Sequence, residues 1–385
     1  MDTLEEYRAQ IDAIDAQLSQ LFLRRMAVTG QVGEYKKAHG LPVLDARRER
    51  EVLMKKAALV DDPQRKGDVH AFFESIMAIS RRQQRRLVTE GAEDPGYGRW
   101  LAALEHRREP VAAPRVVYQG EPGCYSSEAA AGFFGEEVKA AGLPWFGDVF
   151  QALAEGRADY AVLPVENSST GSIRQVFDLL AQYNFSLVGE WQVKVEHCLA
   201  ALPGVGLEDI RSVYSHEQGL MQCDRFLDAH PAWRRVPTLD TAGSAKQVAE
   251  TGDRQAAAIC SRRAAKLYGL EVLAAPINHN AANVTRFVVV SPVLELRPGR
   301  DKISALFSLP HQSGSLHEIL TTFAVQGLNL QKLESRPIPG RGWEYLFFLD
   351  FSGDLTAPGM DGVLHELSQL SADFRILGNF KAYEP

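Results

Sequence analysis

Apolar side chains recur at alternating spacings of three and four over the first 90 residues, and no strand-like run interrupts them. Along the first predicted helix the row occupies ten positions: Leu4, Tyr7, Ile11, Ile14, Leu18, Leu21, Arg25, Val28, Val32 and Tyr35. Arg25 would be costly to bury there without a carboxylate or an anionic ligand beside it. In the third predicted helix, apolar positions 69, 73 and 76 are followed by Ser80 and Gln84. The pattern predicts three helices whose apolar seam is broken by polar side chains.

Two further basic residues of the first predicted helix bear on Arg25. Lys36 follows it by 11 residues, or about three helical turns, so both side chains point to the same side. Arg8 precedes it by 17 residues, which separates the two arginines by roughly 25 Å along one helix. If both serve one small ligand, Arg8 must come from an antiparallel partner subunit. The alternative is that Arg8 is a solvated surface residue.

Residues 115–293 alternate short β-rich runs with helical runs, which is the pattern of an α/β domain. Several predicted strands lead into hydroxyl or amide side chains where a helix begins, as after Gln119, Val165 and Tyr214. Such residues are ordinary N-caps, so each junction has a structural explanation. Together they place helix N-termini at the carboxyl ends of strands, where a small dicarboxylate would be favoured. The glycines form neither GxGxxG nor a P-loop, which argues against a nucleotide.

The stretch from Asn278 to Phe287 runs into the apolar residues Val288–Val290 and predicts the mouth of a buried strand. It carries three amides, the Thr285 hydroxyl and the Arg286 guanidinium. Polar groups at such a position cost free energy unless they are paired. A pocket for a polar, anionic ligand would pair them, and a well-satisfied turn is the alternative.

The last segment is predicted to follow the order β-α-β-β-α-β of a ferredoxin-like fold. Its predicted elements are Ile303–Leu309, Leu316–Gln326, Leu328–Pro337, Glu344–Phe351, Met360–Leu370 and Phe374–Tyr383. Pro298–Asp301 reads as a boundary before it. We therefore expect a multidomain chain with a three-helix domain at 1–90, a linker at 91–114, an α/β domain at 115–295 and an α+β domain at 300–385.

Composition narrows the possible functions. The chain has 385 residues, of which 45% are hydrophobic and 24% charged, as in soluble globular proteins. No apolar run approaches the ~18 residues of a membrane span, and the acidic start Met1–Glu6 does not resemble a signal peptide, so we expect a cytoplasmic protein without a membrane partner. The four scattered cysteines predict neither a disulfide framework nor a zinc site. A net charge of −7 argues against nucleic acid as a partner.

Residues 4–88 resemble the all-helical chorismate mutase domain. The resemblance rests on eight positions: Arg8, Arg25, Lys36, Asp45, Arg48, Glu49, Ser80 and Gln84. It implies the rearrangement of chorismate to prephenate, a unimolecular reaction that needs no cofactor, metal, acid or base. Such a site holds the substrate in a folded conformer and stabilises the charge that develops at the breaking ether bond.

The same resemblance implies roles for these residues. Arg8 and Arg25 would clamp carboxylates, with Arg48 in support. Lys36 and Gln84 would donate to the ether oxygen, Glu49 would accept a substrate hydroxyl, and Ser80 would contact the substrate. Asp45 has an equal structural explanation as the N-cap of the second helix. The remaining basic residues of the third helix are predicted to form a solvated face: Arg81, Arg82, Arg85 and Arg86.

Residues 115–291 resemble prephenate dehydratase. The resemblance rests on four motifs: Gly120-x-x-Gly123-x-Tyr125-Ser126, Pro164-Val165-Glu166-Asn167-Ser168, Ser215-His216-x-Gln218 and Thr285-Arg286-Phe287. It implies two α/β lobes around a cleft, as in periplasmic binding proteins, with the chain crossing near residue 191 and returning near residue 275. The implied reaction removes water and carbon dioxide from prephenate together and yields phenylpyruvate.

Breaking the ring C–O bond requires an acid or a strong hydrogen-bond donor. By resemblance Thr285 is the essential hydroxyl, acting as a proton donor or by positioning and hydrogen bonding to the leaving group. Further residues are expected to line the site: Asn167, Ser215 and Gln222. Arg286 would hold a carboxylate or, alternatively, form a structural ion pair. His216 is an alternative acid or a structural residue, and Cys124 stands where the family commonly has threonine.

Gly314-Ser315-Leu316 and Glu334-Ser335-Arg336-Pro337 resemble the amino-acid-binding ACT domain of prephenate dehydratases. The resemblance implies that L-phenylalanine binds between paired domains and inhibits the enzyme by a population shift. The expected effector-binding residues are Gly314, Leu316, Glu334, Ser335 and Arg336. A purely structural dimerisation module is the alternative.

Together these features predict a homo-oligomeric enzyme, a dimer or tetramer, of phenylalanine biosynthesis that carries both activities. Two other hypotheses account for parts of the sequence. One is a non-catalytic sensor that combines a two-lobed solute-binding fold with an ACT domain. The other is a dehydratase in which residues 1–90 form only a dimerisation arm, which leaves Arg25 and Lys36 on the seam unexplained.

Overall fold

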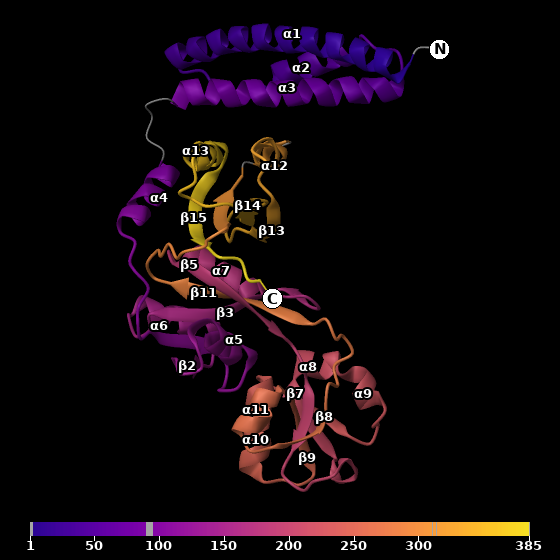
Figure 1. Cartoon of the computed structure of the whole chain (residues 1–385), viewed down its shortest axis with the longest axis vertical. Helices are drawn as coiled ribbons and strands as arrows, with labels where there is room; N and C mark the ends of the chain where they lie inside the picture. The colour runs from indigo at the N-terminus through magenta and orange to yellow at the C-terminus, as the bar shows by residue number, and fades with distance from the viewer. Residues whose placement is uncertain (1–2, 90–94, 310, 313, 385) are drawn as a thin grey trace. The chain divides into compact units, whose positions relative to one another are not determined.

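The computed structural model describes residues 3–89, 95–309, 311–312 and 314–384. These residues form two compact units. The first unit comprises the described residues of Met1–Gly98, Gln312–Gln326 and Gly362–Ala372, and the second comprises the others (Figure 1). The division differs from the consecutive domains expected from the sequence, because two helices of the last segment group with the N-terminal helices.

The three predicted N-terminal helices are confirmed as α1 (Leu4–His39), α2 (Ala46–Ala57) and α3 (Pro63–Thr89). Thr3 caps α1 through a reciprocal capping box with Glu6, which satisfies two backbone N–H groups of the first turn. Gly40 ends the helix at a φ of +62°, a left-handed conformation that glycine adopts without a steric penalty. Helix α3 packs against both α1 and α2.

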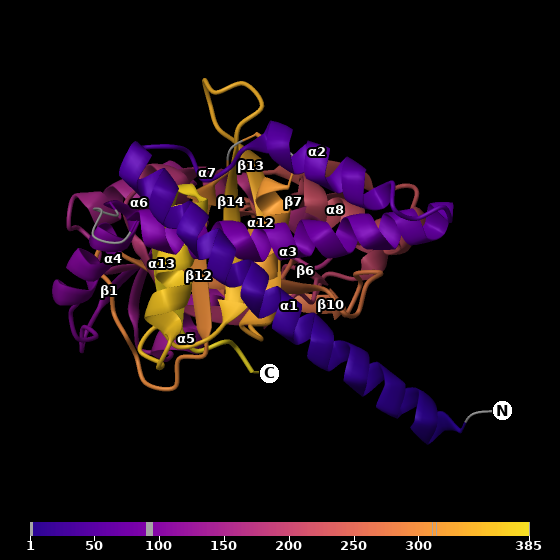
Figure 2. The same ribbon diagram turned by 90° about the horizontal axis from the view of Figure 1, so that it is seen from above.

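The N-terminal half of α1 has an uncovered apolar face. Figure 2 shows this half extending past α2 and α3 towards the labelled N-terminus. Its apolar side chains are 45% to 65% exposed: Leu4, Tyr7, Ile11, Ile14 and Leu18. The predicted seam is therefore present in the sequence but not buried within a single chain, and a contiguous apolar surface of this kind usually marks an interface.

The segment predicted as a linker contains a helix, α4 (Pro95–Glu105). Residues 91–94 of that prediction lie outside the described residues. Trp100 on α4 is only 4% exposed, and the Arg108 backbone N–H donates to the Leu294 carbonyl. Much of the predicted linker is therefore packed structure, because burying an indole outweighs the local Pro and Gly signals.

Two α/β lobes follow within the second unit, as expected. The sheet of the first lobe contains β1 (Arg115–Gln119), β2 (Lys139–Leu143), β3 (Tyr160–Asn167), β4 (Gly171–Ser172), β5 (Ser186–Lys194) and β11 (Val284–Ser291). Its order is β2-β1-β3-β11-β5, with β4 paired to β3. Its helices are α5 (Tyr125–Phe134), α6 (Phe146–Ala154) and α7 (Arg174–Gln182).

The sheet of the second lobe contains β6 (Cys198–Ala201), β7 (Ser212–His216), β8 (Arg234–Thr238), β9 (Ala256–Cys260) and β10 (Glu271–Ala274), in the order β10-β6-β9-β7-β8. Its helices are α8 (Glu217–Gln222), α9 (Asp224–Asp228), α10 (Thr241–Thr251) and α11 (Arg262–Leu267), with a 3₁₀ turn at Leu207–Asp209. The chain enters this lobe after β5 and returns before β11, close to the two predicted crossing points.

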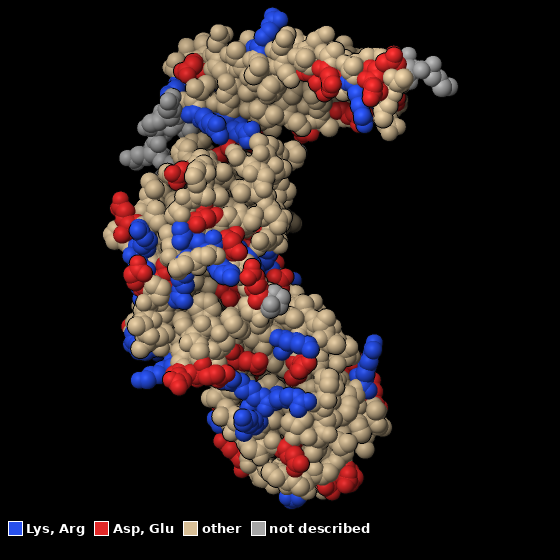
Figure 3. Space-filling model, viewed as in Figure 1, with Lys and Arg blue, Asp and Glu red and all other residues tan. Residues whose placement is uncertain are grey.

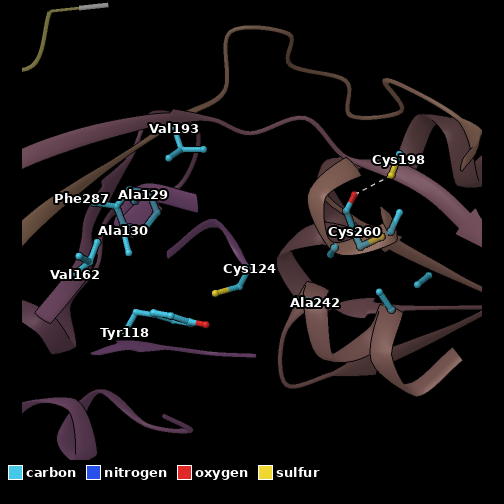
Figure 4. Close-up of a cluster of buried hydrophobic side chains, with 14 of the residues drawn as sticks. Tyr118, Cys124, Ala129, Ala130, Val162, Val193, Cys198, Ala242, Cys260 and Phe287 are labelled. Carbon is cyan, nitrogen blue, oxygen red and sulfur yellow. Dashed lines mark hydrogen bonds between the residues drawn. The ribbon is translucent and has the colours of Figure 1, made fainter. Parts of the chain in front are cut away.

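One hydrophobic cluster contains residues of both lobes. In the close-up of Figure 4, Tyr118, Val162 and Phe287 come from the first lobe, and Ala242 and Cys260 from the second. The small side chains of the second lobe allow its helices to approach the sheet closely.

The last segment confirms the predicted element order, with β12 (Lys302–Ser308), α12 (Ser315–Val325), β13 (Leu330–Pro337), β14 (Tyr345–Ser352), α13 (Met360–Leu370) and β15 (Ala372–Phe380). Its sheet has the order β13-β14-β12-β15. Strand β15 lies so close to β5 that a Cβ atom at Gly378 would be 1.9 Å from the Leu187 carbonyl oxygen. The sheet therefore packs directly against the first lobe.

Candidate functional site

A cavity of about 180 Å³ lies among α1, α2 and α3. Seven of the eight residues expected at a mutase site line it: Arg25, Lys36, Asp45, Arg48, Glu49, Ser80 and Gln84. Arg8 does not, because it lies on the half of α1 that extends away from the other two helices, and its side chain is exposed. The structure thus assembles most of the predicted set within one chain.

The Arg25 guanidinium is held by the polar break in the seam of α3. Its Nη1 donates to Ser80 Oγ over 2.5 Å, and Ser80 Oγ donates to the Ile76 carbonyl over 2.8 Å. Burial lowers the pKa of Arg25, and the nearby Glu49 carboxylate opposes that shift. Gln84 is buried, and its Oε1 has no hydrogen-bond partner among the described residues. A buried amide oxygen without a partner, beside a guanidinium that is fixed by a hydrogen bond, is expected of a ligand-binding site.

Asp45 has both of the roles considered for it. Its carboxylate caps α2 by accepting from the Arg48 backbone N–H over 2.9 Å. It also lines the cavity, together with Lys36, whose Nζ donates to the Val43 carbonyl over 2.5 Å. A capping carboxylate can therefore contribute charge to the cavity without leaving its helix.

Arg81 was missed by the sequence reasoning. It was predicted to belong to a solvated basic face, but it is only 9% exposed, lines the cavity and donates to the Glu49 carboxylate. The prediction failed because the partner carboxylates of Arg81 come from other helices. The available sequence signal was its position between two expected site residues, Ser80 and Gln84.

A second cavity, of about 540 Å³, lies between the two α/β lobes. Three residues expected at a dehydratase site line it: Asn167, Gln222 and Thr285. His216 also lines it, but its imidazole caps α8 by accepting from the Gln218 backbone N–H over 3.2 Å. That contact supports the structural interpretation of His216.

Thr285 and Asn167 are directly opposite on the paired strands β11 and β3. Asn167 Oδ1 accepts from the backbone N–H groups of Ser169 and Thr170, which fixes the orientation of the amide. Asn167 Nδ2 must then be the donor to Thr285 Oγ1, at 2.8 Å. Since the hydroxyl oxygen accepts this bond, its own hydrogen can be donated into the cavity.

His197 lines the same cavity and was not identified from the sequence. It is 2% exposed, and burial lowers its pKa, so the imidazole is neutral at neutral pH. Its Nε2 lies 2.9 Å from Gln222 Oε1 and its Nδ1 lies 3.1 Å from the Tyr125 hydroxyl. The only sequence signal was a histidine between β5 and β6, where the chain crosses between the lobes.

The N-terminus of α5 also faces this cavity. Its N-cap, Cys124, makes no side-chain hydrogen bond to the first turn, and Tyr125 and Ser126 line the cavity. Burial raises the pKa of the Cys124 thiol to about 11. The site therefore has a neutral thiol where the family commonly has a hydroxyl, and it offers helix N–H groups that favour an anion.

Two predicted substrate contacts are wrong in this structure. Ser215 is fully buried, does not line the cavity and donates to the Ile259 carbonyl over 2.8 Å. Arg286 lies between two cavity-lining residues of β11, Thr285 and Phe287, so strand alternation turns it to the opposite face. There its guanidinium pairs with two carboxylates, which supports the structural alternative for this residue.

The ionic cluster around Arg286 links the sheet of the last segment to the first lobe. Arg286 Nε donates to Glu190 Oε2 over 2.7 Å, and its Nη2 lies 2.7 Å from Asp350 Oδ2. Lys302 Nζ donates to the other Glu190 oxygen over 2.6 Å. The Glu190 side chain is 1% exposed. A buried cluster of this kind is strongly destabilised when one partner is removed.

The expected effector residues of β13 do not share one face. Glu334 Oε2 accepts from Ser172 Oγ over 2.6 Å, and Arg336 pairs with both oxygens of Asp178 at 2.9 and 2.8 Å. Ser335 lies between them on the opposite, exposed face of the strand. Glu334 and Arg336 therefore contact the first lobe, and Ser335 faces the other side of the strand. Gly314 is the N-cap residue of α12, with a φ of +89°, and Leu316 lies in its first turn.

Charge and metal-binding groups give no other candidate. Figure 3 shows lysine and arginine interspersed with aspartate and glutamate over the two α/β lobes on the face in view. Within residues 3–89, 95–309, 311–312 and 314–384, no group of three His, Cys, Asp or Glu side chains could hold a metal ion. None of the helices described there has the length and apolar content to cross a membrane.

Comparison with known proteins assigns both cavities to families. A model of prephenate dehydratase matches residues 116–293, and a model of chorismate mutase type II matches residues 7–85. The bifunctional chorismate mutase/prephenate dehydratase of Escherichia coli K12 is 32% identical over 96% of this chain and 94% of its own length. Arogenate dehydratase 3 of Arabidopsis thaliana is 40% identical over 69% of this chain and 66% of its own length.

A solved structure agrees with these matches. Prephenate dehydratase from Arthrobacter aurescens, in complex with L-Phe, is 32% identical and has a TM-score of 0.64, covering 70% of this chain and 90% of that one. The helical cavity lies within the mutase match and the interlobe cavity within the dehydratase match. Because the Escherichia coli relative matches nearly the whole length of both proteins, this chain belongs to the family of bifunctional chorismate mutase/prephenate dehydratases.

Proposed function

We propose that the two cavities catalyse consecutive reactions of phenylalanine biosynthesis. The helical cavity converts chorismate to prephenate, and the interlobe cavity converts prephenate to phenylpyruvate with loss of water and carbon dioxide. The observation that carries this proposal is that both cavities contain the polar residues their reactions need: seven of the eight expected mutase contacts, and Thr285 with Asn167.

In the helical cavity, catalysis depends on charge and shape rather than on proton transfer. Arg25, held by Ser80, binds a substrate carboxylate, and Lys36 and Gln84 donate to the ether oxygen as its bond breaks. Gln84 is buried and lines the cavity, so its Nε2 is the donor to the ether oxygen, and its Oε1, which has no partner among the described residues, remains as an acceptor for the substrate. Glu49 accepts a substrate hydroxyl, and Arg48 and Asp45 complete the charged lining.

In the interlobe cavity, Thr285 donates its hydroxyl hydrogen to the leaving hydroxyl group of prephenate. The Asn167 amide supports this direction because it occupies an acceptor position on Thr285 Oγ1. Loss of the ring carboxylate supplies the electrons for the departing C–O bond. Gln222 and the α5 N-terminus bind the polar and anionic parts of the substrate, and His197 holds Gln222 in place.

Arogenate is the second candidate substrate for the interlobe cavity. The 40% identity to a plant arogenate dehydratase favours it, because this relative matches the dehydratase part of the chain. Arogenate carries an amino group where prephenate carries a keto group, while the ring chemistry is the same. Comparing the kcat/KM values of the two substrates decides between them.

We further propose that the active form is a homo-oligomer. The exposed apolar half of α1 supports a partner helix at this position, and Arg8 lies on the same half. An antiparallel α1 from a second subunit would bring its own Arg8 to the end of the cavity that holds Arg25. Burial of a broad apolar face also gives a stable association.

We also propose L-phenylalanine as a feedback inhibitor, with Gly314, Leu316 and Ser335 as its binding residues. The hydrogen bond from Ser172, which lines the interlobe cavity, to Glu334 supports a physical route from β13 to that cavity. Glu334→Ala is expected to weaken inhibition while leaving the basal dehydratase rate intact. If inhibition by L-phenylalanine is unchanged in this variant, Glu334 does not couple β13 to the interlobe cavity.

The domain boundaries are proposed at 1–90, 115–295 and 300–385, and a cytoplasmic location is proposed from the four free cysteines. The decisive experiment supplies purified protein with chorismate alone and follows prephenate and phenylpyruvate, with and without L-phenylalanine. Phenylpyruvate that decreases when L-phenylalanine is added supports all three functions. Chorismate that is not consumed overturns the mutase assignment, and prephenate that accumulates overturns the dehydratase assignment.

A further inference from the structure

Arg81 on α3 joins the mutase cavity to α12 within the first unit. Its Nη1 donates to the Glu49 carboxylate, which lines the cavity. Its Nε donates to Glu318 Oε1 on α12 over 2.5 Å, and its Nη2 lies 2.5 Å from the same oxygen. The side chain of Arg81 is 11% exposed, that of Glu49 is 23% exposed and that of Glu318 is 15% exposed. One guanidinium thus occupies a buried position between two carboxylates of different helices.

We propose that Arg81 is a positioning residue of the mutase cavity, that it holds Glu49 in its substrate-binding orientation, and that α12 keeps it in place through Glu318. This inference rests on the proposed mutase function of the cavity. It assigns to α12, an element of the C-terminal segment, a direct influence on a site built from α1, α2 and α3.

The geometry of the guanidinium explains why one arginine can connect the two helices. The group is planar and presents its N–H donors in fixed directions. Because Nε and Nη2 both face Glu318, the direction of the remaining Nη1 is set by where Glu318 lies. A displacement of Glu318 therefore reorients the donor that holds Glu49. Lysine has a single, freely rotating ammonium group and could not transmit direction in this way.

Glu49 needs such a partner because the cavity offers it competing cations. Burial lowers the pKa of Arg25, and the Glu49 carboxylate is close enough to oppose that shift. If Glu49 paired with Arg25 directly, one interaction would remove both a substrate hydroxyl acceptor and a carboxylate-binding guanidinium. Charge-assisted pairing with Arg81 holds Glu49 away from that alternative, while Arg25 donates to Ser80 Oγ.

Helix α3 also contacts a carboxylate of α13, and that contact does not lead to the cavity. Glu366 on α13 lies 3.4 Å from both Arg82 Nη1 and Arg86 Nη2 and accepts from Thr322 Oγ1 over 3.0 Å. Neither Arg82 nor Arg86 lines the mutase cavity. Arg85 Nη2 also lies 2.7 Å from Glu318 Oε2, so each glutamate has two arginine partners, and the side chains of Glu366 and Glu318 are 5% and 15% exposed. Glu366 lacks the connection to Glu49.

The test compares Glu318→Gln with Glu366→Gln in the full-length protein. Each substitution removes one carboxylate charge and preserves the side-chain shape. We expect Glu318→Gln to raise the KM for chorismate about fivefold to tenfold with kcat within about twofold, because Glu49 binds the substrate in both ground and transition states. Glu366→Gln should leave both constants within about twofold, and dehydratase activity reports folding in each variant.

A double substitution identifies the route. In a Glu49→Gln background, Glu318→Gln should have no further effect on the KM, because its influence passes through Glu49. Arg81→Met should reproduce the effect of Glu318→Gln, and Arg81→Lys should not rescue it. If Arg81→Met fails to fold, the KM values for chorismate of Glu318→Gln and Glu366→Gln still test the proposal.

The outcomes separate the inference from the function on which it rests. Wild-type protein without mutase activity overturns the proposed function, and the inference with it. Wild-type activity with equal KM values for Glu318→Gln and Glu366→Gln overturns the inference alone. An effect of Glu318→Gln that persists unchanged in the Glu49→Gln background also overturns it, because the influence would then bypass Glu49.

Discussion

The Asn167 side-chain amide donates to the Thr285 hydroxyl oxygen over 2.8 Å, from the opposite position on the neighbouring strand. Thr285 thereby acquires a defined direction for its own hydrogen, although threonine is intrinsically a weak acid. The strand pairing supplies this direction without a charged group. Thr285 can therefore act as a directed hydrogen-bond donor even if it never transfers its proton completely.

Removing the Thr285 hydroxyl should disable the dehydratase alone. We expect Thr285→Val to lower the dehydratase kcat by about 100-fold or more, the range of a lost proton or hydrogen-bond donor, and Thr285→Ser to retain much of the rate. Steady-state kinetics with prephenate measures the effect, and mutase activity in the same preparation is the internal control. A valine variant with the wild-type rate would show that the hydroxyl is not required, and a serine variant as inactive as the valine variant would show that the hydroxyl alone is not sufficient.

Inactive mutase variants should complement one another. We expect Arg8→Ala and Arg25→Ala each to lose most mutase activity, since each removes a carboxylate-binding guanidinium. After unfolding and refolding together in equal amounts, the mixture should regain roughly a quarter of the wild-type activity, because about half of the dimers are mixed and one of the two sites in each mixed dimer is intact. Refolding each variant separately is the control. If the mixture stays inactive, the partner subunit does not supply Arg8.

The neutral His197 predicts a pH dependence of stability. Burial lowers its pKa below the ordinary value of 6.5, so the unfolded chain binds a proton more readily than the folded protein. Stability should therefore fall as the pH drops below about 6.5. We expect His197→Gln to reduce the slope of Tm against pH between about 7 and 5. The exposed His106→Gln variant serves as control, and equal slopes in all three proteins would contradict the prediction.

Substitution of Arg286 should affect stability more than substrate binding. Arg286→Met leaves the Glu190 and Asp350 carboxylates without their shared cation, and we expect a loss of about 3 kcal/mol in the free energy of unfolding. Once the variant is folded, its KM for prephenate should change by less than about threefold. Denaturant unfolding and steady-state kinetics test the two parts. A large rise in the KM for prephenate with unchanged stability would show that Arg286 binds the substrate.

Local periodicity predicted most of the architecture. The three N-terminal helices and the order of the last six elements follow from spacing and strand propensity, and the resemblance to prephenate dehydratase implied the two crossing points between the lobes. The helix in the predicted linker was missed, because its stability comes from burying Trp100 rather than from a local signal.

The candidate sites were predictable only where a residue type is tied to a local position. Asp45 at a helix start and Ser80 on the seam are of this kind. The amides of the Asn278–Phe287 stretch were not, because Asn278 Oδ1 accepts from the His197 backbone and Nδ2 donates to the Val195 and Asn280 carbonyls. For Asn278 the well-satisfied turn was the correct alternative, whereas Thr285 faces the cavity.

The sequence by itself determined most of the helices and strands, because these depend on residue type and spacing within a few turns, and its resemblance to known families indicated which residues carry the chemistry. Only the tertiary structure decided which partner each polar side chain contacts. Arg286 and Arg81 look alike in the sequence, as single arginines beside expected site residues. Strand alternation turns Arg286 away from the interlobe cavity to the opposite face, where Asp350 pairs with it. Carboxylates from two other helices pair with Arg81 and hold it at the helical cavity. Those partners are distant in the chain, so no local pattern could reveal them.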